Sequence, residues 1–138
     1  MASILKVDEL QGITAAGDIT VTSEGGAATQ SLQQGLAKAW VNFNGTGTIA
    51  TRDSLNVSGL VDNGTGDYTV NFSSSFDNAN YTYAFSSNGG SSSFIREAQQ
   101  GTVATASFSY LAKYWSAITT ANADDATYQN IVIHGDLA

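Results

Sequence analysis

All fourteen aromatic side chains of this chain lie at position 40 or beyond. Aromatic side chains bury more apolar area than most other residue types, so a segment without them has little material for a core of its own. From residue 40 onwards they fall in short runs that alternate apolar and polar residues. The sequence therefore predicts two parts: an N-terminal segment and neck over residues 1–38 that packs against other chains, and a folded tip domain over residues 39–138.

The second part has the pattern of strands separated by turns. The alternation is clearest in Tyr68–Phe72, Tyr81–Phe85 and Ala104–Tyr110, and this period of two indicates half-buried strands. Further strands are expected at 40–43, 46–50, 55–61 and 128–135, and the N-terminal segment is expected to contain one more at 17–22. Because the chain has no proline, its turns depend on Gly, Asn and Asp, as at 44–45, 62–67, 88–93 and 122–125. The expected fold is all-β, an antiparallel β-sandwich with six or seven short strands in the tip.

The neck contains one helical pattern. Leu32, Leu36 and Ala39 recur at helical spacing, and Thr29 is a suitable N-cap residue. This narrow apolar stripe has two interpretations, a seam between copies of the chain or a surface helix lying on its own domain. The chain also lacks cysteine, and a small β-protein without disulfides often gains buried area by forming an oligomer.

The charge and the hydrophobic pattern of the chain argue against nucleic acid and membrane as partners. The net charge is −7 and the charged fraction is 12%. No two of the basic residues are clustered; they are Lys6, Lys38, Arg52, Arg96 and Lys113. Nucleic acid is not expected as a partner, since phosphate binding needs a basic surface. Membrane insertion is not expected either, because no apolar run approaches about 20 residues, and no secretory signal is present at the N-terminus.

The residues for catalysis are sparse. His134 is the one histidine, no G-x-S-x-G nucleophile motif occurs, and most carboxylates fall in turns, where they bend the backbone. We therefore expect no enzyme, no catalytic residue and no cofactor; a small carbohydrate-active enzyme is a remote alternative. Asn122, Asp124 and Asp125 could bind calcium or form a solvated turn, and the absence of an EF-hand spacing favours the turn, so no metal is expected.

Two sets of residues are candidates for contact with a glycan. Tyr81, Tyr83 and Phe85 share one face of a strand, where they could stack on sugar rings or fill the core, and alternation favours the core. The loops are the better candidates for contact with a receptor. Their candidate residues are Asn63, Asp67, Asn88, Ser92, Asp124 and Asp125.

Several stretches carry a resemblance to a known group of proteins. They are residues 3–8 (SILKVD), 39–47 (AWVNFNGTG), 52–58 (RDSLNVS), 62–72 (DNGTGDYTVNF), 78–81 (NANY) and 131–136 (IVIHGD). In order and spacing, residues 39–138 resemble the C-terminal tip domain of tail-fibre and related virion proteins of marine tailed bacteriophages. The family often has a long shaft between its two ends, whereas the stretch between the matching ends is short here.

The resemblance implies a homotrimer with an exposed C-terminal tip. It also implies attachment to another virion protein through the N-terminus, for which Ile4, Leu5, Val7 and Leu10 are the candidate residues, with Leu32, Leu36 and Ala39 as the candidate trimer seam. The expected function is that of a short tail fibre or spike that mediates attachment to the host surface. The alternative is a capsid head fibre or decoration protein with a structural role. In both cases the chain is made in the bacterial cytoplasm and ends in the virion.

Overall fold

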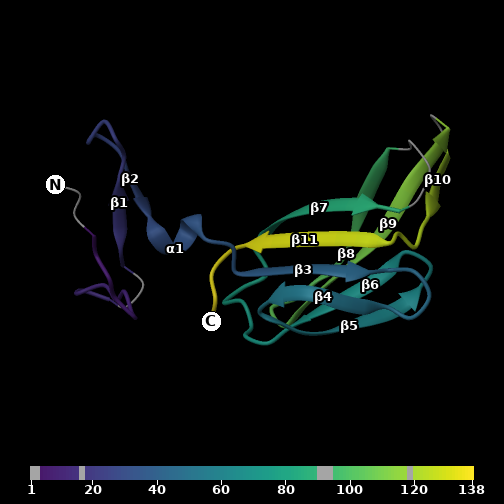
Figure 1. Cartoon of the computed structure of the whole chain (residues 1–138), viewed down its shortest axis with the longest axis horizontal. Coiled ribbons are helices and arrows are strands. Elements are labelled where there is room, and N and C mark those ends of the chain that lie inside the picture. Colours follow the sequence, from purple (N-terminus) through teal and green to yellow (C-terminus); the bar gives the residue numbers. More distant parts are fainter. Residues whose placement is uncertain (1–3, 16–17, 90–94, 118–119) are drawn as a thin grey trace. The chain divides into compact units, whose positions relative to one another are not determined.

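The computed structural model describes residues 4–15, 18–89, 95–117 and 120–138. It divides the chain into two compact units, Met1–Leu36 and Ala37–Ala138 (Figure 1). Within the described ranges, no helix is long and apolar enough to cross a membrane.

The N-terminal unit contains little regular structure. Strand β1 (Thr20–Thr22) pairs antiparallel with β2 (Thr29–Ser31), and a single helical turn, α1 (Leu32–Gly35), follows. The Ser31 hydroxyl caps this turn by accepting a hydrogen bond from the Gln34 amide at 3.4 Å. None of the described residues in this unit is buried. The described residues of this unit therefore form no apolar core of their own.

The predicted helix beyond Gly35 is wrong. Leu36 already has an extended backbone, with φ −95° and ψ 142°, and Ser31 rather than Thr29 is the cap. Gly35 is a poor helix former, and Ala39 is the first residue of a strand in which it alternates with Val41 and Phe43. Ala39 is only 1% exposed and belongs to the core of the second unit. Leu32, Leu36 and Ala39 therefore do not form one helical stripe.

The second unit consists of two antiparallel sheets (Figure 1). The first sheet has the strand order β4-β3-β11-β7. Its strands are β4 (Ala50–Leu55), β3 (Ala39–Asn44), β11 (Tyr128–His134) and β7 (Thr82–Asn88). The last strand of the chain thus lies at the centre of this sheet, between β3 and β7.

The second sheet is organised around the long strand β9 (Ser107–Ala117). Its other strands are β5 (Val57–Gly64), β6 (Asp67–Phe72), β8 (Arg96–Val103) and β10 (Thr120–Ala123). Strand β6 pairs with residues 107–111 of β9, and β8 pairs with β9 over an overlapping range, so β6 and β8 lie on opposite edges of β9. Strand β10 pairs with the C-terminal part of β9.

The core lies between the two sheets, where the inward-facing residues of alternating strands meet. Phe43 of β3 contacts Tyr68 of β6 with ring centroids 5.1 Å apart, and Tyr83 of β7 contacts Phe108 of β9 at 4.5 Å. These cross-sheet contacts make the unit an antiparallel β-sandwich. The buried hydrophobic cluster comprises Ala39, Val41, Phe43, Tyr68, Val70, Phe72, Phe76, Phe108, Tyr110, Ala112, Ile131 and Ile133.

Between β4 and β5, the chain passes from the first sheet to the second through a single residue. Asn56 separates β4 from β5 and has a positive φ of 55°, a conformation that asparagine tolerates better than most residues. Its side chain accepts a hydrogen bond from the Ser74 amide at 2.6 Å and donates one to the Ser74 carbonyl at 3.0 Å. The predicted continuous strand over residues 55–61 is therefore wrong, because the backbone turns a corner at Asn56.

Other strand predictions were wrong in part. Residues 46–48 form a bend rather than a strand, and 104–106 form the connection before β9. Strands β8 and β10 were not predicted, and the expected loop over residues 62–67 is a tight hairpin whose turn is Thr65–Gly66. The structure therefore has more strands than the alternation alone predicts.

Candidate functional site

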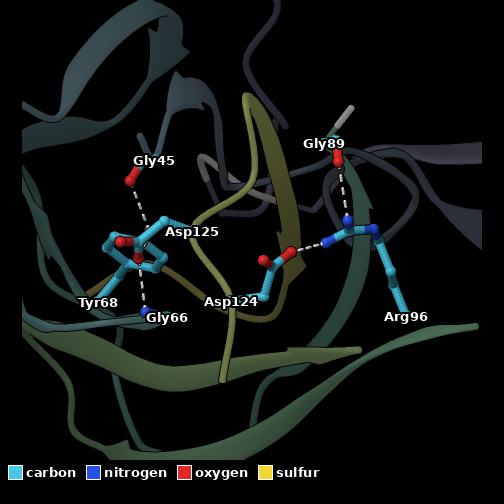
Figure 2. Close-up of polar contacts among 7 residues, drawn as sticks. All are labelled: Gly45, Gly66, Tyr68, Gly89, Arg96, Asp124 and Asp125. Carbon is cyan, nitrogen blue, oxygen red and sulfur yellow. Dashed lines mark hydrogen bonds and ion pairs between the residues drawn. The ribbon is translucent and has the colours of Figure 1, made fainter. Parts of the chain in front are cut away.

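The candidate site lies at the end of the sandwich where the β10–β11 connection meets the turns at Gly45 and Gly66 (Figure 2). The Asp125 carboxylate accepts hydrogen bonds from the Gly66 amide at 2.6 Å and from the Tyr68 hydroxyl at 2.7 Å. The Tyr68 hydroxyl also lies 2.9 Å from the Gly45 carbonyl, and the Gly45 amide donates to the Ala126 carbonyl at 3.0 Å. Three segments far apart in sequence are thus joined by one polar network.

An ion pair also holds the connection between β10 and β11, through the neighbouring residue Asp124. Arg96, at the start of β8, pairs with Asp124 and donates to the Gly89 carbonyl at 3.0 Å (Figure 2). The two side chains are 11% and 24% exposed, so the pair is partly shielded from solvent. The Asp124 amide also donates to the Ala112 carbonyl at 3.0 Å. Both carboxylates of the predicted loop therefore hold protein groups together.

Glycine permits the close approach of these segments. A Cβ atom on Gly66 would lie 2.5 Å from the Ala112 carbonyl oxygen, and one on Gly89 would lie 2.7 Å from the Ala126 Cα. Gly66 also has a φ of +69°, in the left-handed region that favours glycine. No larger residue fits at either position without a shift of the backbone around it.

The electrostatics of the network keep the tyrosine neutral. Burial raises the pKa of Tyr68 far above its ordinary value, and the hydrogen bond and charge of Asp125 raise it further. The hydroxyl therefore stays protonated and remains a donor at any physiological pH. This arrangement positions the backbone segments of the loop end relative to one another.

The structure places the predicted loop residues in two settings. Asn63 and Asp67 lie at the ends of the strands β5 and β6, where the Asn63 amide donates to the Asp67 carboxylate at 3.4 Å and to the Thr69 hydroxyl at 2.9 Å. Asn88 is exposed at the end of β7. Asp124 and Asp125 are half-buried in the networks above, and Ser92 lies outside the described residues.

Sequence reasoning missed the partners that hold this end together. Arg96 is an isolated basic residue in a stretch without alternation, and Tyr68 shows only the pattern of a core strand. The one available signal was the pair of glycines at 64 and 66, which indicated a turn. Their contact with Asp125 spans 59 residues and has no local signature.

The aromatic side chains of β7 face the core, and this confirms the prediction from alternation that they fill the core rather than stack on sugar rings. Tyr83 packs on Phe108, and Phe85 packs on Tyr110 with centroids 5.4 Å apart. The Tyr81 hydroxyl lies 3.0 Å from the Ala104 carbonyl and 3.1 Å from that of Ser107. These side chains fill the space between the sheets and do not form an exposed stacking platform.

The structure also gives the positions of His134 and of most candidate docking residues. His134 is half-buried at the end of β11, opposite Thr82 of β7. Over the described ranges, no group of three or more His, Asp or Glu side chains could hold a metal ion. The candidate docking residues Ile4, Leu5, Val7 and Leu10 are all more than half exposed.

Comparisons of this chain with protein-family models, with curated proteins and with solved structures find no match.

Proposed function

We propose that this chain is a structural appendage of a tailed bacteriophage virion, a short tail fibre or spike that attaches the particle to the host surface. The observation that carries the proposal is the contrast between the two units. The described residues before Ala37 include none that is buried, whereas the second unit encloses an apolar core between two sheets. A chain with one self-sufficient domain and one uncovered segment is suited to being anchored by that segment.

The exposed apolar residues support this division of roles. Seven large hydrophobic residues of the N-terminal unit are 48% to 105% exposed, whereas the described part of the larger second unit has five exposed ones. The seven are Ile4, Leu5, Val7, Leu10, Ile13, Val21 and Leu36. Concentrated exposed apolar surface marks a protein interaction site. We infer that this segment packs against another virion protein and against two further copies of the chain.

The loop end of the sandwich is the proposed contact with the host. The network around Asp125 and Tyr68 and the Arg96–Asp124 pair hold the β10–β11 connection in place. Rigid loops bind with a smaller loss of conformational entropy than mobile ones. Three copies would multiply a weak contact with a surface receptor through avidity.

Immunogold labelling of intact virions with an antibody against residues 39–138 tests the location. Gold at the tail end supports the proposal, and host adsorption should then fall when the antibody is bound. Gold over the head would support the alternative, a capsid head fibre or decoration protein, for which the shortness of the N-terminal unit is an argument. Particles without gold would contradict both.

Incorporation into particles tests the anchoring segment separately. The substitution Leu5→Asp places a charge at a side chain that is 77% exposed, and we expect it to abolish incorporation of the full chain. Ile95→Asp is the matched control, because Ile95 is 76% exposed in the second unit and lies outside the proposed anchor. Equal incorporation of the two variants would contradict the anchoring role.

A further inference from the structure

The outer face of the first sheet carries a shallow groove of about 420 Å³. It crosses β3, β11 and β7, and its volume falls in the range of small-molecule sites. The pairing of the strands places Trp40, Val132 and Ala84 in one row across the sheet. The next outward-facing row consists of Asn42, Asn130 and Ser86. The groove thus has an apolar row with an indole ring and a polar row beside it.

The polar row is ordered by its own hydrogen bonds. The Asn42 amide nitrogen donates to the Asn130 side-chain oxygen, and the Asn130 amide nitrogen donates to the Ser86 carbonyl at 3.4 Å. Each side-chain amide has two N–H groups, so one remains on each residue, together with the Asn42 oxygen. These groups have no partner within the described part of the chain. The row therefore presents a fixed set of donors and an acceptor along the groove.

The position of these asparagines is unfavourable for folding alone. Asparagine is depleted in strands, yet Asn42 and Asn130 face each other on β3 and β11, the two central strands of the sheet. The adjacent pair, Trp40 and Val132, follows the ordinary preference for aromatic and β-branched residues. Residues that violate local preferences are expected at functional sites, and other parts of the protein offset their cost in stability.

We propose that this groove binds a neutral saccharide. Trp40 supplies an apolar surface for a sugar ring, and the side-chain amides of Asn42 and Asn130 match hydroxyl groups, which both donate and accept hydrogen bonds. No charged residue lines the groove, and the net charge of −7 disfavours an anionic ligand.

An extended peptide does not suit this surface. Peptides that add to a sheet do so at an edge strand with unpaired backbone groups. Strand β3 is paired on both sides, with β4 and β11, and β11 is paired on both sides, with β3 and β7. The groove lies on the face of these strands, where side chains make the contacts.

The inference of a saccharide site does not depend on the virion role, because it concerns the purified chain alone.

Tryptophan fluorescence of the full chain provides the test. The chain has two tryptophans, so the substitution Trp115→Phe leaves Trp40 as the sole reporter. The probes are glucose, galactose, mannose, N-acetylglucosamine and their β1-4-linked oligomers, with galacturonic acid as the anionic comparison. We expect saturable changes of Trp40 emission at millimolar concentrations of at least one neutral sugar, and no change with galacturonic acid.

Substitutions then locate the site. Asn130→Ala should weaken binding about tenfold, as expected for the loss of a hydrogen-bonding group worth about 1.4 kcal/mol. Asn71→Ala is the matched control, since Asn71 is a half-buried, outward-facing asparagine on β6 of the other sheet, and its binding should be unchanged. Far-ultraviolet circular dichroism confirms that both variants are folded.

Three results would overturn the proposal. They are the absence of any saturable response to the neutral sugars, equal weakening by Asn130→Ala and Asn71→Ala, and concentration-dependent dimerisation that Asn130→Ala abolishes. The third would make the face an interface between copies. Because these measurements use no virion, they can fail while the labelling experiment succeeds, and the reverse also holds.

Discussion

The Asp125 carboxylate lies 2.7 Å from the Tyr68 hydroxyl, although 57 residues separate them in the sequence. Tyr68 belongs to the second sheet, and Asp125 belongs to the connection that leads into the last strand of the first sheet. The same hydroxyl lies 2.9 Å from the Gly45 carbonyl, which follows β3 of the first sheet. One buried phenol thus links both sheets at the loop end of the sandwich.

Removal of this hydroxyl should destabilise the protein. In Tyr68→Phe, the Asp125 carboxylate loses the single O–H donor of the tyrosine in a site with little solvent. We expect the free energy of unfolding to fall by about 1.5–3 kcal/mol, the usual range for a hydrogen bond to a charged group. Urea denaturation of the full chain measures the change. Tyr83→Phe is the control, because no described residue bonds the Tyr83 hydroxyl, and a similar loss in both variants would refute the role of the network.

Replacing Tyr110 by phenylalanine should instead increase the free energy of unfolding. The Tyr110 hydroxyl is buried and makes no hydrogen bond with any described residue, and the side chain is 1% exposed. An unpaired buried hydroxyl costs free energy, and its removal leaves the ring contacts with Phe85 and Tyr68 intact. We expect Tyr110→Phe to raise the free energy of unfolding by up to about 1 kcal/mol. A clear loss of stability would show that the hydroxyl has a partner, such as an ordered water molecule.

Stability should decline in alkaline solution because of the buried tyrosines. Burial raises the pKa of Tyr68, Tyr81 and Tyr110 above the ordinary value. Above a pH of about 10, the unfolded chain loses these protons more readily than the folded chain does. The unfolded state is therefore favoured by up to about 1.4 kcal/mol per pH unit for each tyrosine. The contribution is fully present below pH 10 and is lost as pH rises towards the folded-state pKa.

Urea denaturation at a series of pH values from 9 to 11 measures this effect. Tyr110→Phe should reduce the slope of the decline, because one of the tyrosines with a raised pKa is then absent. A slope unchanged by this substitution would show that Tyr110 does not contribute.

Two glycines with similar backbone conformations should respond differently to alanine. Gly66 and Gly47 have φ values of +69° and +64°, so Gly→Ala adds backbone strain of about 1–2 kcal/mol at each position. A Cβ on Gly47 meets no atom within 4 Å, whereas one on Gly66 lies 2.5 Å from the Ala112 carbonyl oxygen. We therefore expect Gly66→Ala to cost clearly more than Gly47→Ala in thermal denaturation. Equal costs would mean that the loop end has room to relax.

Local pattern was sufficient for the central strands and their orientation. The alternation in Tyr68–Phe72 and Tyr81–Phe85 predicted both strands and which side chains face inward, because successive residues of a strand point to opposite faces. It also predicted that Tyr83 fills the core rather than a surface platform, and the ring contact with Phe108 confirms this. For such segments, burial of one face is the dominant force, and the sequence records it directly.

Strands β8 and β10 depended on the tertiary structure. Arg96–Val103 is rich in polar residues and contains one glycine, and it becomes a strand because the edge of β9 offers backbone groups for pairing. Likewise, the predicted helical stripe ended at Gly35 because Ala39 is buried in the sandwich. In both cases, long-range packing and pairing outweigh the weak local preference.

The sequence by itself determined that the chain has an aromatic-free N-terminal segment and a β-rich domain made of alternating strands. The tertiary structure alone decided which residues meet, namely Asp125 with Tyr68, Arg96 with Asp124, and Asn42 with Asn130. The physical reason is that alternation is a property of neighbouring residues along one strand. Pairing between distant strands depends on the simultaneous burial of both sheets, which no local segment encodes.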